Sequence, residues 1–282
     1  MTSPVRHHFV PQLIIRNFTD EEGWVHGFDK DRPERGVFKS RPDKVFVERH
    51  LYSVYDSAGR LVPAAEDAFG RLEDTLAPII RKIIAAARSG TVPGLDPTER
   101  TWWDLFFFMQ WKRVPDMHRA TTSDARVFAQ FDAITARLLL ERPDEREAIE
   151  ALMHPEKKAQ MVKNARVGAL IDPGTQVPLA LASRGLAILT IPDDRRSFAL
   201  GSHPVVKLAV RGSKDLRDPQ SEVWLPIAPD VAVGPGNHKD WEAGYSLSEA
   251  RLVRHLNSAT WQQSSSVIAR APALVRSLAF PR

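Results

Sequence analysis

The sequence predicts an α+β fold with short N-terminal strands, a central helical bundle, and C-terminal mixed strands with closing helices. Three patterns support it: alternating polarity near the start, apolar residues at helical spacing in the middle, and strand-like apolar runs after residue 185. With 282 residues, of which 43% are hydrophobic, the chain can bury a substantial core. We expect one domain over 1–282, β-rich over 1–62, helical over 63–165 and mixed α/β over 166–282.

Short strands are predicted in the first part of the chain. Trp24 to Phe28 alternates in polarity and follows a turn-like segment, Asp20-Glu21-Glu22-Gly23. Val37 to Lys39 and Leu51 to Tyr55 are also typical of strands. These segments predict a β-rich beginning.

Helices follow. From Pro63 to Gly90, apolar side chains recur at three- and four-residue spacing, which predicts one apolar helix face. Asp96 or Thr98 can cap the next helix, whose segment Trp102 to Met109 is apolar nearly all round. Such a helix is typical of the middle of a bundle. Further helices are predicted at about 117–141 and 144–164.

Strand patterns return in the last third of the chain. We expect strands at 186–191, 197–200, 205–210 and 223–227. A segment with Gly234-Pro235-Gly236-Asn237 predicts a loop over 230–247. Two helices are expected at the end, over 248–262 and 272–278.

Composition excludes several classes of site. The chain has no cysteine, so disulfides, thiolate metal ligands and cysteine nucleophiles are excluded. No apolar run is long enough for a signal peptide or a bilayer span, so we expect a cytoplasmic protein with no membrane partner. The net charge of +4 arises mainly after Arg195. A phosphate-binding face and scattered, solvated arginines both explain it, and the second explanation is favoured because no tight cluster forms.

The most informative motif is His7-His8-Phe9-Val10-Pro11-Gln12, continued by Leu13 to Thr19. Together with Gln110 to Arg119, Gly201 to Val205 and Leu225 to Pro229, it resembles the mainly bacterial family known as domain of unknown function 4238. The resemblance extends over nearly the whole chain and implies relatives without implying an activity. His203 stands where the family usually has an acid, so the role of that position is open.

The His7-His8 pair is the first candidate site. Adjacent side chains on an extended segment point to opposite faces, so one histidine can face a site while the other faces the core. Histidine changes charge near neutral pH and binds metals. The alternative is that both rings are structural and hydrogen-bond to backbone or acidic groups.

Glu66 and Glu73 are the second candidate. A spacing of seven residues places both carboxylates on one helix face, where they could hold a divalent cation. An exposed acidic stripe is the favoured alternative. A divalent metal is therefore a candidate cofactor, with His8, Glu66 and Glu73 as its ligands.

Gln110, Arg113 and Arg119 follow the most apolar helix. An arginine at this position suits the recognition of phosphate or carboxylate, because its planar fork binds two oxygens. An ion pair with Asp116, Glu66 or Glu73 explains it equally well.

Ser202-His203 is expected at a strand end or turn. A serine nucleophile is disfavoured because adjacent residues do not reach triad geometry and no Gly-x-Ser-x-Gly motif is present. A polar wall of a site is the more plausible role for this segment.

The absence of three motifs disfavours ATP hydrolysis by a P-loop, a Rossmann cofactor and a zincin fold. There is no P-loop, no Rossmann fingerprint and no His-Glu-x-x-His. His8, Asn17 and His26 are spaced somewhat like the ligands of a ββα-metal nuclease. His26 lies in a predicted strand where that site needs a helix, and little chain precedes His7, so this interpretation is disfavoured.

The leading hypothesis is a pocket for metal-assisted hydrolysis of a phosphoester, including nucleic acid in a defence or toxin setting. Its catalytic residues would be His7, His8, Arg113, Ser202 and His203, and its binding residues Gln12, Asn17 and Gln110. The competing hypothesis is a non-enzymatic module that binds a ligand, nucleic acid or protein and whose histidines are structural. The sequence leaves the oligomeric state open.

Overall fold

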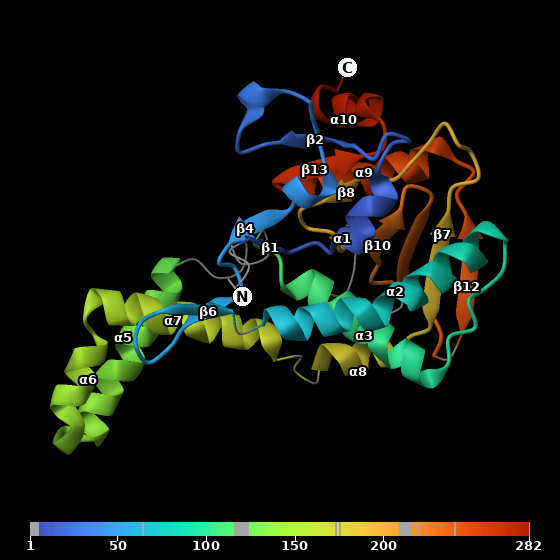
Figure 1. Ribbon diagram of the computed structural model, residues 1–282. Helices are drawn as coiled ribbons and strands as arrows, with labels where there is room; N and C mark the ends of the chain where they lie inside the picture. The colour runs from blue at the N-terminus through green and yellow to red at the C-terminus, as the bar shows by residue number, and fades with distance from the viewer. Residues whose placement is uncertain are drawn as a thin grey trace. The chain divides into compact units, whose positions relative to one another are not determined.

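The computed structural model describes residues 6–63, 65–115, 124–172, 174, 176–208, 216–218, 220–239 and 241–281. Helices and mixed sheets are both present (Figure 1), which confirms the α+β class. The chain divides into two compact units with interleaved segments. Unit 1 takes residues 1–7, 48–70 and 117–172, and unit 2 takes 8–47, 71–116 and 173–282.

Unit 1 combines a small hairpin with helices. Strands β5 (Ser53–Tyr55) and β6 (Leu61–Pro63) pair antiparallel, and the helices are α5 (Asp124–Glu141), α6 (Arg146–Leu152) and α7 (Pro155–Ile171). Asn164 of α7 holds the hairpin, because its amide donates to the Tyr55 carbonyl at 2.8 Å and accepts from the Tyr55 N–H at 2.7 Å. The single helix predicted over 144–164 is wrong. His154 has extended backbone, as is usual before a proline, and Pro155 then begins α7.

Unit 2 contains a five-stranded sheet in the order β12-β7-β11-β10-β9. Its strands are β7 (Leu186–Thr190), β9 (Val206–Lys207), β10 (Val223–Ala228), β11 (Val231–Pro235) and β12 (Glu242–Ser246). Every residue of β10 and β11 is buried, so both faces of the sheet centre are covered. The loop predicted over 230–247 is wrong, because β11 and β12 both lie in it. Gly234 and Pro235 are accommodated at the end of β11, where they pair with Ala187 and Leu186.

A second, antiparallel sheet in unit 2 has the order β3-β2-β13-β8. Its strands are β2 (Val25–Asp29), β3 (Phe38–Ser40), β8 (Leu200–Gly201) and β13 (Ser266–Ala269). Phe28 of β2, Ala269 of β13 and Val275 of α10 (Pro272–Ala279) form a buried cluster. This sheet places His26 between Lys39 and Ala269.

The remaining elements are short segments and helices, and β1 and β4 among them form a two-stranded sheet. Short segments near the N-terminus are β1 (Arg6–His8), α1 (Gln12–Ile15), η1 (Arg16–Phe18), η2 (Pro33–Arg35), η3 (Pro42–Lys44) and β4 (Val47–Arg49), and η4 (Pro143–Glu145) precedes α6. The longer helices are α2 (Glu66–Arg88), α3 (Pro97–Lys112), α8 (Gln176–Ala182) and α9 (Ala250–Gln263). Asp96 caps α3, as predicted, through a capping box with Glu99.

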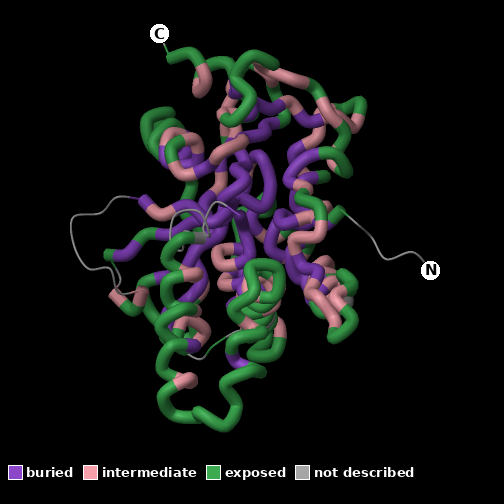
Figure 2. The backbone as a smooth tube through the Cα atoms, turned by 90° about the vertical axis from the view of Figure 1, so that its left-hand side faces the viewer, coloured by how far each residue is buried: buried purple, intermediate pink, exposed green. Residues whose placement is uncertain are grey.

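The helices α2 and α5 differ in how much of their surface is buried. On α2 the apolar face predicted from spacing is buried, including Leu76, Ile80 and Ile83. On α5 most positions are exposed. Figure 2 colours buried residues purple and exposed residues green along the chain. None of the helices in the described ranges combines the length and apolarity that a membrane crossing needs.

Asp104 of α3 is a buried carboxylate. Arg100, one turn earlier, donates to its Oδ1 at 3.0 Å and also reaches the carbonyls of Arg184 and Gly185 at 2.7 and 3.1 Å. Burial raises the pKa of Asp104 to about 6, against the opposing effect of Arg100. Between pH 3.8 and about pH 6, the Asp104 carboxyl is therefore mostly protonated in the folded protein and mostly ionised in the unfolded chain.

We expect Asp104→Asn to change how stability depends on pH. In the wild-type protein this carboxyl binds its proton more tightly when folded, so its contribution to stability falls as pH rises from 3.8 to about 6. The Asn side chain does not titrate in this pH range, so the variant does not lose this stability as the pH rises. The unfolding free energy of the variant, relative to that of the wild type, should therefore increase by roughly 2 kcal/mol across this range. Urea unfolding at pH 4 and pH 6.5 measures it. A difference that is constant or falls with pH contradicts the expectation.

Candidate functional site

An open cleft of about 880 Å³ lies in unit 2. Its wall is built by the turn before β2, the end of α2, the segment after β7, the turn between β10 and β11, and the start of α10. The residues that line it are Asn17, Asp20, Glu21, Glu22, His26, Arg88, 191–197, Pro229, Asp230 and 270–272. Because the lining is rich in charged groups, the cleft suits a polar ligand.

Asp20 organises the turn that leads into β2. Its Oδ1 accepts from the backbone N–H groups of Glu22 and Trp24 at 3.0 and 2.8 Å. The turn closes through Asp20 N–H to Trp24 O at 2.7 Å, and Gly23 has φ +77°, which a glycine adopts at little cost. The hydrogen bond from Trp24 is the main cause that lowers the pKa of Asp20, which is therefore a carboxylate at neutral pH.

The second oxygen of Asp20 holds a histidine. Oδ2 lies 3.1 Å from His26 Nε2, and the imidazole is largely buried, with 14% of its side chain exposed. Because the partner is an ionised carboxylate, Nε2 carries the proton of the neutral ring and Nδ1 is left as an acceptor. This is the arrangement by which a carboxylate orients a general base.

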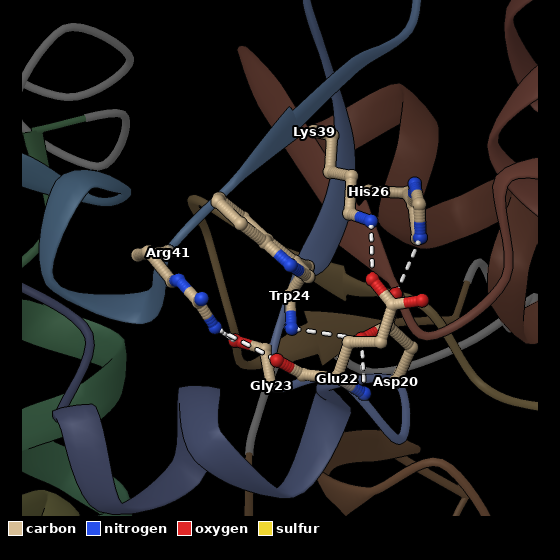
Figure 3. A network of polar contacts seen from close by, with 7 residues as sticks. All are labelled: Asp20, Glu22, Gly23, Trp24, His26, Lys39 and Arg41. Atoms are coloured by element: carbon tan, nitrogen blue, oxygen red, sulfur yellow. Dashed lines mark hydrogen bonds and ion pairs between the residues drawn. The ribbon is translucent and has the colours of Figure 1, made fainter.

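Stacked cations support the same turn (Figure 3). The Arg41 guanidinium lies 3.7 Å from the centre of the Trp24 ring and donates to the carbonyls of Glu22 and Gly23 at 2.8 and 3.2 Å. Lys39 forms a 2.9 Å ion pair with Glu22. The turn is thus fixed from both sides, and with it the carboxylate that orients His26.

Four arginines lie on the cleft wall. Arg88 binds Asp230 with two hydrogen bonds of 2.7 and 2.8 Å, which raise the pKa of Arg88. Burial opposes ionisation of Asp230, yet the bonds from Arg88 lower its pKa overall. This pair is a bidentate link between α2 and the β10–β11 turn.

Of the other three arginines, Arg196 donates to the Ser248 carbonyl at 2.8 Å, whereas Arg195 and Arg270 are more available. Arg196 pairs with Asp193 at 3.2 Å, and Arg270 lies 3.9 Å from the highly exposed Glu21. Arg195 is exposed and forms no ion pair within the part of the chain that the structure describes. Arg195 and Arg270 can therefore reach an anionic group of a ligand with little loss of internal pairing.

His7 is fully buried in unit 1, where its ring contacts Tyr52 and Glu66. Its Nδ1 accepts from the Tyr52 backbone N–H at 2.9 Å, and its ring stacks on the Tyr52 ring at 5.4 Å. Its Nε2 lies 3.7 Å from Glu66 Oε2. His8, the next residue, is only partly buried, so the predicted alternation of faces agrees with the burial pattern of β1.

Arg113 is also fully buried, in unit 2. Its Nε donates to the Phe9 carbonyl at 3.1 Å, and its second terminal nitrogen pairs with Glu73 at 2.8 Å. When the Gln110 amide is turned so that its oxygen faces the guanidinium, it accepts two further bonds of 3.1 and 3.3 Å. The sequence left two explanations open for Arg113, recognition of an anionic ligand and an internal ion pair. The structure contains the ion pair, with Glu73.

Comparison with known proteins identifies the family. A family model described as "Protein of unknown function (DUF4238)" matches residues 6–273. The chain belongs to the DUF4238 family. The resemblance inferred from the His7-His8 motif is thereby confirmed. No curated protein and no solved structure matches the chain.

In this DUF4238 protein the other predicted residues have the following contacts. Gln12 accepts from Arg16 at 2.9 Å, and Asn17 donates to the Ile227 carbonyl at 2.8 Å beside the cleft. The Ser202 hydroxyl accepts from the Ser265 and Ser266 N–H groups at 3.0 and 3.1 Å. The backbone N–H of His203 donates to the Ser264 hydroxyl at 3.2 Å, and the residue is buried. We infer that Ser202 and His203 link β8 to the start of β13.

The predicted metal ligands are divided between the two units, with Glu66 in unit 1 and His8 and Glu73 in unit 2. Across the described residues, no three His, Asp or Glu side chains gather where they could hold a metal ion. Glu66 pairs with His7 in unit 1, whereas Glu73 pairs with Arg113 in unit 2. Arg119 and Asp116 lie outside the described residues. A metal held by His8, Glu66 and Glu73 stays a prediction.

The Asp20–His26 pair was missed as a site in the sequence, although both of its parts were identified. The turn at 20–23 and the strand over 24–28 were predicted, and His26 is indeed in a strand. The sequence does contain a signal for this pair. An aspartate stands at the start of a turn, where its side chain can accept a hydrogen bond from the backbone N–H two residues later, and a histidine follows six residues after it. Spacing alone does not show that one carboxylate oxygen accepts the turn's N–H groups while the other lies at the histidine ring.

We expect Arg113→Ala to destabilise the protein strongly. Removing the guanidinium leaves the Phe9 carbonyl, Gln110 and Glu73 without their donor in a buried region, which should lower the unfolding free energy by about 3 kcal/mol. Denaturant unfolding measures the loss. Arg251→Ala is the matched control, because its ion pair with Glu249 is exposed and should be worth under about 0.5 kcal/mol. Equal effects of the two substitutions contradict the structural role of Arg113.

Proposed function

We propose that this DUF4238 protein is a hydrolase that acts on a small polar substrate with an anionic group. The observation that carries the proposal is the Asp20–His26 pair on the wall of the 880 Å³ cleft. A histidine whose one nitrogen is fixed by a carboxylate is poised to accept a proton at the other. Arg195 and Arg270 supply positive charge on the same wall.

The proposed chemistry uses His26 as a general base. Nδ1 accepts a proton from a water molecule while the water oxygen bonds to the electrophilic atom of the ester, and the bond to the leaving oxygen breaks. The imidazolium then returns the proton to the leaving oxygen. Asp20 stabilises the transient positive charge on the ring, and its own lowered pKa keeps it ionised while it does so.

The charge of the cleft favours a small substrate over a polyanion. The wall carries Arg88, Arg195, Arg196 and Arg270, but also Asp20, Glu21, Glu22, Asp193, Asp194 and Asp230. A polynucleotide backbone would be repelled by these carboxylates, whereas one phosphate or carboxylate can lie against Arg195 or Arg270. Of the substrates expected from the sequence, a small phosphoester therefore fits better than nucleic acid.

The proposal assigns no catalytic role to the His7-His8 motif or to Arg113. The contacts of His7 and Arg113 with backbone atoms support a structural role, as the competing hypothesis for the histidines expected. The charged lining of the cleft also fits a second candidate function, a module that binds a small polar ligand there without turning it over. The two functions differ in whether bound ligand is cleaved.

The direct test is hydrolysis of small chromogenic phosphate and carboxylate esters by wild type and two variants. For the ester that is turned over, we expect His26→Ala to lower kcat by about 100-fold or more, the usual contribution of a general base. Asp20→Asn should also lower kcat, because the amide no longer stabilises the charged ring. Circular dichroism and thermal unfolding establish that each variant is folded.

His238→Ala is the control, since His238 is an exposed histidine that does not line the cleft. It should leave kcat unchanged. Unchanged turnover in His26→Ala contradicts the proposed base. Ligand binding in the cleft with no turnover of any ester favours the binding module instead.

A further inference from the structure

A second groove of about 600 Å³ lies between α9 and α10 in unit 2. Its apolar lining comes from both helices, with Val253 and Trp261 on α9 and Leu274 and Leu278 on α10. Asn257, Ser258 and Ser277 add neutral polar groups. An organic group with an aromatic or aliphatic surface can bury apolar area here.

The charges of this groove all have one sign. Arg195, Arg196 and Arg254 line it, and its lining contains no acidic residue. Arg254 is exposed on α9 and forms no ion pair with any residue in the described ranges. This contrasts with the catalytic cleft, whose wall has more carboxylates than arginines. The lining of the groove therefore favours an anion.

The two hollows meet at a common wall. Arg195, Arg196, Ser197 and Ala271 line both of them. A molecule whose anionic group lies at Arg195 can extend into the cleft on one side and into the groove on the other. Each end then meets a different environment, polar near His26 and apolar near Leu274.

We infer that the groove binds the apolar part of the substrate, so that the substrate is an organic anion with an aromatic or aliphatic arm. The arm lies between α9 and α10, and the phosphate or carboxylate lies against Arg195 and Arg254. The reacting end lies in the cleft with His26. This inference deepens the proposed function and rests on it only for the reacting end.

Binding of a non-hydrolysable probe tests the inference. 1-Naphthylphosphonate has an apolar arm and an anion joined by a carbon–phosphorus bond, and calorimetric titration measures its Kd. We expect it to bind at least tenfold more tightly than inorganic phosphate or 1-naphthol, which each carry one half of the recognised chemistry. The 1-naphthoate ion, tested in parallel, distinguishes carboxylate from phosphonate recognition.

Variants within the groove provide the matched controls. Ser277 is exposed and lines the groove, so Ser277→Glu adds a carboxylate there and Ser277→Gln adds the same volume without charge. The first should weaken binding of the probe about tenfold more than the second. Arg254→Gln should weaken it by a similar factor, whereas Arg251→Gln, on the same helix but outside the groove, should not.

The outcomes separate this inference from the proposed function. His26→Ala should leave the Kd of the probe nearly unchanged while it abolishes ester hydrolysis. Probe binding that depends on Arg254 and Ser277, with no ester turned over, supports the groove and overturns the hydrolase. Absence of probe binding at millimolar concentration, or equal Kd values for Ser277→Glu and Ser277→Gln, overturns the groove.

Discussion

The cleft depends on the carboxylate of Asp20, because the two oxygens of this carboxylate have different partners. One oxygen accepts the two backbone N–H groups that close the turn before β2, and the other holds His26 at 3.1 Å. The hydrogen bonds that fix the turn also lower the pKa of Asp20, so the carboxylate that orients the imidazole is ionised. Local backbone structure and site chemistry are thereby coupled in a single side chain.

Three of the residues by which the sequence resembles the family hydrogen-bond to the backbone and do not line the cleft. His7, Arg113 and Ser202 each hydrogen-bond to main-chain atoms of a segment distant in sequence: Tyr52, Phe9, and Ser265 with Ser266. Buried polar side chains of this kind satisfy main-chain groups that the core would otherwise leave without partners. Residues that identify the family in the sequence can therefore be the ones that build its fold.

Local patterns in the sequence predicted much of the fold. The apolar spacing of α2, the Asp96 cap of α3 and the turn before β2 all arise from interactions within a few residues, which is why the sequence reveals them. Strands β11 and β12 were not predicted, because Gly234, Pro235 and Gly236 are typical of loops and only pairing with β7 overrides them. The cleft was not predicted either, since Asp20, Arg195, Asp230 and Arg270 come together only through tertiary structure.

In the proposed site an ionised Asp20 fixes His26 so that Nδ1 of the ring can accept a proton. Nitrogen-15 NMR of the imidazole rings measures this directly, because protonated and unprotonated ring nitrogens have well-separated chemical shifts. We expect neutral His26 to carry its proton on Nε2 in the wild-type protein, and Asp20→Asn to redistribute the proton between the two ring nitrogens. A proton on Nδ1 in the wild-type protein, or the same tautomer in both proteins, would contradict this expectation.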